Sequence, residues 1–383
     1  MRAYVFTDPT LTRRAGQFVW LSIDTEKAQN APFSKKYPIR SWPSFYVIDP
    51  VSEKVVLRWV GGATVAELDK LFDDGRRAVS QSKASTASLA KADALFSDGK
   101  YEESIPAYRE ALKTLKTTSP SYARAVESLL YSLMEAQQRV ECVNLARSVM
   151  PAVRGSAAAA TVAGSGLDCA LGLPPAVADR ASAVAAFEKD VRDVLADPKL
   201  HVAADDRSAL YGTLYDARKD AGDRAGAERV AREWVADLDA AAHAAKTPEQ
   251  WTALDPNRLN AYEAAGELVK AIPMLEKSEK DFPDDYNPPA RLALVYLKLK
   301  RYDEALKASD DAMAKVYGPR KLRVFAVRTD IYKAMGNDAA AQKTVKDALA
   351  YAEALPPGQR SEGAIASLRN QLGVEPASGP CGH

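Results

Sequence analysis

Apolar positions divide the chain into a short strand-like part and a long helical part. Residues 17–24 and 44–49 are rich in β-branched and aromatic side chains, which is typical of strands. A turn-forming segment follows the second of these and leads into another apolar run at residues 54–59, which predicts a β-hairpin. Residues 26–37 predict a short helix between the first two strands, as in the crossover of a βαβ unit.

Beyond the hairpin the periodicity is helical almost throughout. Residues 63–81 place Val65, Leu68, Leu71 and Phe72 on one face with charged residues opposite, which predicts an amphipathic helix. Abundant alanine favours helix in the rest of the chain. The pattern therefore predicts a mainly α protein.

The helical part contains internal repeats. Segments beginning at Gly99 and Lys300 share the same order of aromatic, acidic and small positions, and a related segment begins at Gly266, 34 residues before Lys300. Gly222 and Gly336 begin looser matches. These segments resemble the turn and second helix of a tetratricopeptide repeat (TPR), whose period is 34 residues. We also expect two degenerate helical hairpins, at residues 122–153 and 157–196.

Packing explains the spacing. Small residues such as Ala92, Ala111, Ala305 and Ala312 let the two helices of a hairpin approach closely. Larger ones such as Tyr108 fill the gap to the next hairpin. Since one hairpin cannot bury its apolar face alone, stacking is what stabilises the array, and the resemblance predicts a TPR-like α-solenoid.

The N-terminal segment resembles a different family. Residues 37–47, with Asp24 before them and residues 60–62 after the hairpin, are similar to the second half of a thioredoxin domain. The resemblance covers about residues 18–78 and predicts a partial α/β thioredoxin-like segment. It implies a cis peptide bond before Pro43 and peptide binding by Ser41, Trp42 and Pro43. A partly buried packing role is the alternative for Trp42.

The cysteine pair that gives the thioredoxin family its redox activity is absent. The resemblance implies a Cys-x-x-Cys motif at the start of a helix that would precede residue 18, whereas the three cysteines are Cys142, Cys169 and Cys381. Their number and spacing imply no disulfide framework, and we expect Cys142 and Cys169 to be buried free thiols. Either Met1 is an internal methionine of a longer protein, or the segment is a remnant that helps to cap the helical array.

Composition narrows the functional classes. Lys plus Arg (52) nearly cancels Asp plus Glu (51), so no basic field favours nucleic acid as a partner. No apolar run reaches the roughly 20 residues that span a bilayer, and no signal peptide is evident. The expected location is cytoplasmic as the chain stands, and periplasmic or exported if its start is truncated.

Other candidate chemistry is weak. Residues 164–166 carry a Gly-x-Gly pattern, but no strand precedes it and the third glycine of a dinucleotide-binding loop is missing. His201, His243 and His383 lack partners at zinc-binding spacing. We therefore predict no catalytic residues, no metal and no cofactor.

These observations predict three segments: a partial thioredoxin-like domain (residues 1–80), a TPR-like domain (84–372) and a flexible tail (373–383). The favoured function is a TPR-type protein–protein interaction scaffold with a redox-inactive thioredoxin-like domain and a protein or peptide partner on the repeat groove. The alternative is a thiol–disulfide oxidoreductase whose Cys-x-x-Cys lies upstream. Groove positions such as Leu89 and Asp93 do not form a basic carboxylate clamp, which favours an apolar or helical peptide.

Overall fold

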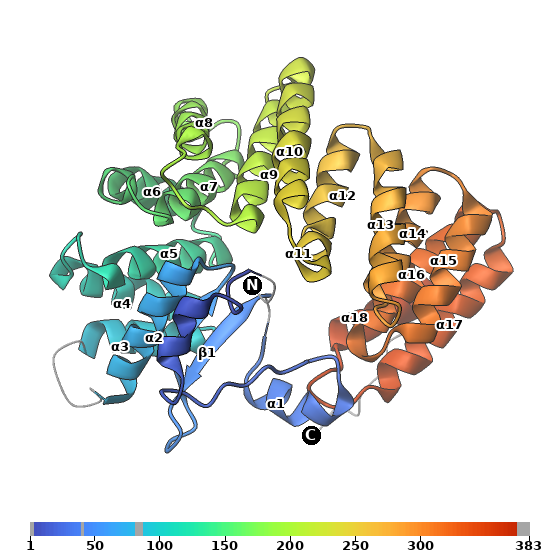
Figure 1. Ribbon diagram of the computed structural model, residues 1–383, viewed down its shortest axis with the longest axis horizontal. Helices are drawn as coiled ribbons and strands as arrows, with labels where there is room; N and C mark the ends of the chain where they lie inside the picture. The colour runs from blue at the N-terminus through green and yellow to red at the C-terminus, as the bar shows by residue number, and fades with distance from the viewer. Residues whose placement is uncertain (1–3, 40–41, 81–86, 374–383) are drawn as a thin grey trace, which may run out of the picture. The chain divides into compact units, whose positions relative to one another are not determined.

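The computed structural model describes residues 4–39, 42–80 and 87–373, and its fold is mainly α, a TPR-like α-solenoid (Figure 1). The chain forms two compact units. Unit 1 comprises the described residues of 1–17 and 41–265, and unit 2 those of 18–40 and 266–383. The chain therefore passes between the units three times.

Unit 1 contains a short β-hairpin and a series of helices. Its elements are η1 (Pro9–Arg14), β1 (Ser44–Ile48), β2 (Val55–Val60), α2 (Val65–Ser80), α3 (Ala87–Ser97), α4 (Tyr101–Thr114), α5 (Pro120–Glu135), α6 (Arg139–Val153), α7 (Ala158–Leu171), α8 (Arg180–Ala196), α9 (Ala204–Asp220), α10 (Arg224–Ala244), α11 (Pro248–Ala253) and α12 (Asp255–Ala264). Helices α3 to α10 pack as four antiparallel pairs. The hairpins predicted at residues 122–153 and 157–196 are confirmed.

The predicted β-hairpin is also confirmed. Strands β1 and β2 pair antiparallel, with Phe45 opposite Trp59 and Val47 opposite Leu57. Strand β2 packs against α3, and its Leu57 and Arg58 are buried. The Arg58 guanidinium lies over the rings of Tyr46 and Phe96, where cation–π attraction offsets part of the cost of burying its charge. The hairpin thereby covers the first helical pair.

The strand predicted at residues 17–24 is wrong. This part of the chain is irregular, with Val19 88% and Leu21 68% exposed. Strand propensity was overridden because a strand also needs a neighbour for its backbone groups, and among the described residues the sheet contains only β1 and β2. The helix predicted at residues 26–37 is shorter, formed by η2 (Ala28–Asn30) and α1 (Ala31–Lys36).

Residues 18–39, here named the strap, belong to unit 2 and are held by polar contacts with its last helical pairs. The Tyr317 hydroxyl donates to Asp24 at 2.7 Å, and Arg320 Nε donates to Glu26 at 2.9 Å. Gln359 Nε2 donates to two backbone carbonyls of the strap at 2.8 and 3.0 Å. The strap is thus a structural part of the C-terminal unit.

The remaining elements of unit 2 are helical. They are η3 (Leu268–Lys270), α13 (Ala271–Asp281), α14 (Asn287–Lys298), α15 (Tyr302–Lys315), η4 (Gly318–Arg320), α16 (Lys321–Ala334), α17 (Asp338–Ala354) and α18 (Glu362–Gln371). Helices α14 with α15 and α16 with α17 form antiparallel pairs. The junction expected near residues 80–85, apart from Ser80, and all of the expected tail except Gly373 lie outside the described residues.

The turns between paired helices share one backbone device, which explains the repeat pattern. A left-handed residue ends the first helix at Gly99, Gln137, Gly222, Lys300 and Gly336. At Lys300, for example, the next N–H bonds back to the Tyr296 carbonyl at 2.9 Å, which closes a Schellman motif. The frames read from Gly99, Gly222, Lys300 and Gly336 are therefore confirmed.

The expected small positions are confirmed as well. Ala92, Ala111, Ala305 and Ala312 are completely buried between paired helices. Tyr108 is also fully buried, and its hydroxyl donates to Asp93 at 2.8 Å. These packing positions, and not catalytic chemistry, account for the most regular part of the sequence.

Candidate functional site: a cavity in unit 1

Unit 1 contains a cavity of about 370 Å³. Its walls come from the end of β2, the start of α2, and helices α5, α7 and α9. Helices α5 and α7 pack side by side, as do α7 and α9, so the first helices of successive pairs form one continuous surface. The small residues Ala160, Gly164 and Ala209 on this surface leave the space open. The cavity is within the size range of small-ligand and side-chain pockets.

Every charged residue that lines the cavity is acidic: Glu67, Glu127, Asp168 and Asp206. Glu67 is positioned by the N-terminus of α2. Its Oε2 accepts the backbone N–H and the hydroxyl of Thr64, both at 2.8 Å, while Thr64 Oγ1 accepts the Glu67 N–H at 3.3 Å. These reciprocal hydrogen bonds between Thr64 and Glu67 form a capping box, which fixes the Glu67 carboxylate in the first turn of α2.

Glu127 and Asp206 both hold their protons more tightly than ordinary carboxyl groups. Burial raises the pKa of Glu127 to about 8, and the negative charges of Glu67 and Asp206 add to the rise, against a hydrogen bond from Thr161 and the charge of Arg124. Burial, then Glu67 and Asp205, raise the pKa of Asp206 to about 6. These carboxyl groups are therefore poorly solvated and surrounded by like charge.

The nearest buried cation is already engaged elsewhere. Arg124 Nη1 and Nη2 donate to the two oxygens of Asp93 at 2.8 and 2.9 Å, and its Nε donates to Asp74 at 2.9 Å. All three side chains are almost completely buried. This network joins α2, α3 and α5. The guanidinium is engaged by both carboxylates, and its charge offsets only part of the rise in the pKa of Glu127.

Aromatic residues form the apolar part of the wall. Phe96 and Tyr131 contact each other edge to face, with ring centroids 5.6 Å apart. Trp59 also lines the cavity, and its Nε1 donates to the Gly62 carbonyl at 2.9 Å, which fixes the orientation of the indole. The site thus combines flat apolar faces with carboxyl groups and has no Lys or Arg in its lining.

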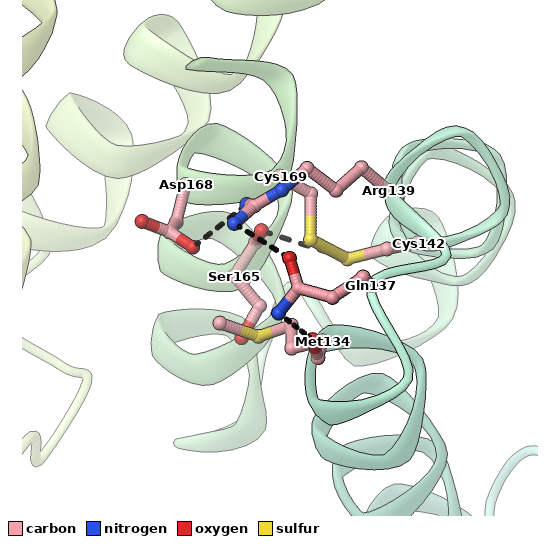
Figure 2. Close-up of a disulfide and its surroundings, with 7 residues drawn as sticks. All are labelled: Met134, Gln137, Arg139, Cys142, Ser165, Asp168 and Cys169. Carbon is pink, nitrogen blue, oxygen red and sulfur yellow. Dashed lines mark hydrogen bonds and ion pairs between the residues drawn. A yellow bond between two sulfur atoms is a disulfide. The ribbon is translucent and has the colours of Figure 1, made fainter. Parts of the chain in front are cut away.

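Cys142 on α6 and Cys169 on α7 form a buried disulfide (Figure 2). The expectation of two free thiols is wrong, because the antiparallel packing of α6 and α7 brings together two residues 27 positions apart. Asp168, next to Cys169, lines the cavity and forms an ion pair with Arg139 at 3.7 Å. The disulfide therefore braces the helix that carries this part of the wall.

The residues predicted to bind peptide do not line this cavity. Ser41 lies outside the described residues. Trp42 is 55% exposed, its peptide bond to Pro43 is cis as the resemblance implied, and the Pro43 carbonyl accepts the Gly61 N–H at 2.9 Å. Gly61 itself lines the cavity. Peptide binding by Ser41, Trp42 and Pro43 stays a prediction.

Two of the expected groove positions are internal. Leu89 and Asp93 are buried, and Asp93 belongs to the Arg124 network. The glycines at residues 164–166 lie within α7 and not in a phosphate-binding loop. A side chain at Gly166 would meet the Phe187 ring at 2.5 Å, so this glycine permits the close approach of α7 and α8. Its role is packing.

The described ranges offer no competing metal or membrane site. No group of three or more His, Cys, Asp or Glu side chains there has the arrangement of a metal site. None of the helices in that part of the chain combines the length and the apolar character that crossing a bilayer requires. The cavity is consequently the candidate site that the structure defines best.

Sequence reasoning missed the cavity because its acidic residues belong to elements far apart in the chain. Glu67 begins α2, Glu127 lies in α5 and Asp206 begins α9. The one local signal was the spacing of Thr64 and Glu67, a capping-box pattern before an apolar helix. It marks a helix start and says nothing about which residues will face Glu67.

Comparison with known proteins gives structural likeness only. No protein-family model and no curated protein matches the chain. Similar solved structures include a tetratricopeptide repeat protein from Parabacteroides merdae, with 12% identity, a TM-score of 0.45, and 74% of this chain and 97% of that one covered. The TPR2AB domain of yeast Sti1 in complex with pHSP90 (13%, 0.28, 75% and 97%) and the assembly chaperone of RpL4, Acl4 (11%, 0.34, 75% and 96%), are also similar.

Proposed function

We propose that the protein is a non-enzymatic interaction scaffold and that unit 1 binds a peptide segment of a partner protein in its cavity. The observation that carries this proposal is the cavity itself, open between the first helices of three successive helical pairs. Stacked hairpins provide a rigid surface whose curvature creates such concave sites. A side chain anchored in a pocket between helices is also how peptides are commonly held in grooves.

The proposal can be tested by selecting binders from a random heptapeptide library on the full chain. Ala209 is exposed on α9 and lines the cavity, so Ala209→Trp fills the space without disturbing the core. Selected peptides should bind this variant about tenfold or more weakly than the parent, since the anchor pocket is lost.

Ala196→Trp is the matched control, because Ala196 is exposed on α8 and does not line the cavity. Peptide affinities measured by fluorescence anisotropy should be unchanged in this variant. If the selected peptides bind both tryptophan variants as tightly as the parent, the cavity is not the binding site and the proposal fails.

The disulfide supports a proposal about compartment. A disulfide persists in oxidising compartments and is rare in the cytosol, so Cys142 and Cys169 favour a periplasmic or otherwise exported location over the cytoplasmic one expected from the sequence. Alkylation of protein taken directly from cells, before and after reduction, tests this. Recovery of both cysteines as alkylated thiols without reduction would contradict it.

The alternative, an oxidoreductase whose Cys-x-x-Cys lies upstream, finds no support in the described residues. Cys142 and Cys169 are bonded to each other and completely buried, which is the character of a structural disulfide and not of an exposed catalytic pair. We propose that the hairpin, which resembles part of a thioredoxin domain, covers the end of the helical array through its contacts with α3.

A further inference from the structure

The cavity of unit 1 has an electrostatic preference that the overall composition conceals. The whole chain is nearly neutral, with a net charge of +1, yet the cavity is lined by four carboxyl groups and by no Lys or Arg. Neutralising these groups from within the protein would need a nearby cation. Arg139 pairs with Asp168 at 3.7 Å, and Arg124, on the same helix as Glu127, is hydrogen-bonded to Asp93 and Asp74.

From this geometry we infer that the cavity recognises a basic side chain, lysine or arginine, of the partner peptide. This inference rests on the proposed function and specifies its ligand. A protonated amine or guanidinium entering the cavity would be within reach of carboxyl groups from three elements, namely Glu67 on α2, Glu127 on α5 and Asp206 on α9. Hydrogen bonds between charged partners are among the strongest that proteins make.

The aromatic residues complete the complementarity. Trp59, Phe96 and Tyr131 supply apolar and π surface beside the carboxylates. The aliphatic stem of a lysine or arginine packs on such surface while its head reaches the charges, and the head itself is attracted to aromatic faces. An acidic side chain would bring a further negative charge beside carboxyl groups that are already poorly solvated, and a purely apolar one would desolvate them without giving them a partner.

The spread of the carboxyl groups favours an extended ligand. They are distributed around a space of about 370 Å³, which is large enough for an organic cation with its stem. Within the described residues they do not converge into a cluster that could hold a metal ion. An organic cation with a long apolar stem therefore fits the lining better than a compact ion.

Proton release should accompany binding. Glu127 is surrounded by Glu67 from α2, Arg124 from its own helix, Thr161 from α7 and Asp206 from α9. Because burial and the acidic neighbours raise its pKa to about 8, it holds a proton near neutral pH. A cation in the cavity lowers that pKa, so affinity for a basic peptide increases between pH 6 and pH 8.5 as the carboxyl groups ionise.

The test uses three acetylated, amidated heptapeptides that differ only at the central residue, which is lysine, norleucine or glutamate, titrated against the full chain by calorimetry. The lysine peptide should bind about tenfold or more tightly than the norleucine peptide, and the glutamate peptide should not bind. Its affinity should rise with pH. Glu67→Gln and Asp206→Asn should each weaken only the lysine peptide, whereas Glu102→Gln, on the exposed face of α4, should change nothing.

The outcomes separate the two proposals. Equal binding of lysine and norleucine peptides, abolished by Ala209→Trp, would overturn the basic-ligand inference and leave peptide binding intact. Lysine binding that is insensitive to both Glu67→Gln and Asp206→Asn would also overturn the inference, with circular dichroism confirming that the variants fold. If none of the three peptides binds and the library selection also fails, the proposed function falls with it.

Discussion

Units 1 and 2 are both built from helical pairs, but the charged residues that line their cavities differ in how they are paired. In unit 2 a depression of about 290 Å³ is lined by Asp310, Arg328, Lys343 and Asp347. There Arg328 pairs with Asp310, and Lys343 pairs with Asp347 at 2.9 Å, so the charges cancel locally. The cavity of unit 1 is lined by carboxyl groups and by no Lys or Arg, and of its four carboxyl groups Asp168 pairs with Arg139. The comparison shows that sites built from similar helical pairs can differ in whether their charged residues are paired within the lining.

The largest expected effect on stability concerns the buried ion-pair network of Arg124 in unit 1. Arg124→Met would leave Asp93 buried without its cation and Asp74 with only Arg77, and should lower the free energy of unfolding by about 3–5 kcal/mol. Urea unfolding followed by tryptophan fluorescence measures this, since Trp42, Trp59, Trp234 and Trp251 lie in unit 1 and only Trp20 in unit 2.

Arg109→Met is the control for that variant. Arg109 pairs with Glu141 on the surface, where an ion pair contributes less than about 1 kcal/mol. If the two methionine variants lose similar stability, the buried network is not what holds α2, α3 and α5 together.

The disulfide should give the next largest effect, and only in unit 1. Replacing both Cys142 and Cys169 by serine should lower its free energy of unfolding by about 2–4 kcal/mol, because the cross-link restricts the unfolded chain. A reductant present during urea unfolding should shift the midpoint of the parent toward that of the double variant. A parent whose midpoint ignores reductant under unfolding conditions would contradict the prediction.

The pH dependence of stability is a further effect expected in unit 1, whose stability should fall as pH rises from 5 to 8.5. The pKa of Glu127 is raised to about 8 in the folded protein, so the folded state retains a proton that the unfolded state has already released. Its contribution to stability is greatest at low pH and is lost as pH rises toward 8. Glu127→Gln should therefore become more stable relative to the parent as pH increases, in thermal unfolding by circular dichroism. A constant difference across this range would contradict it.

The smallest expected effect on the free energy of unfolding concerns the turns between paired helices, and it should be equal in both units. Gln137 and Lys300 hold the left-handed turn conformation that glycine adopts without strain. Gln137→Gly and Lys300→Gly should each stabilise their unit by about 0.5–1 kcal/mol. Lys307→Gly, within α15, should instead destabilise by about 1 kcal/mol, since glycine weakens a helix interior. Thermal unfolding compares them, and destabilisation by either turn variant would show that the residue does more than turn the chain.

The sequence predicted what depends on local chemistry. The frames at Gly99 and Lys300 could be read because a left-handed turn and close-packed alanines recur at a fixed spacing. The strand at residues 17–24 could not be excluded by composition, since its fate depended on whether a neighbouring strand was present.

The candidate site was predictable only as a general groove. Glu67 could be recognised as a cap, but its encounter with Glu127 and Asp206 is set by the stacking of α5, α7 and α9. The disulfide was missed for the same reason, because Cys142 and Cys169 meet only when α6 and α7 pair. Tertiary contacts between distant residues carry no local signature.

The strap has a consequence for biosynthesis. Its residues leave the ribosome long before Gln359, which binds the carbonyl of Thr25 and follows it by 334 residues. Contacts over such separations form slowly, because the entropy of closing a long loop is lost before the contacts can stabilise the chain. During translation, the exposed apolar residues Val19 and Leu21 are therefore made long before the helices that the rest of the strap contacts. Unit 2 is complete only after its last helical pairs have been synthesised.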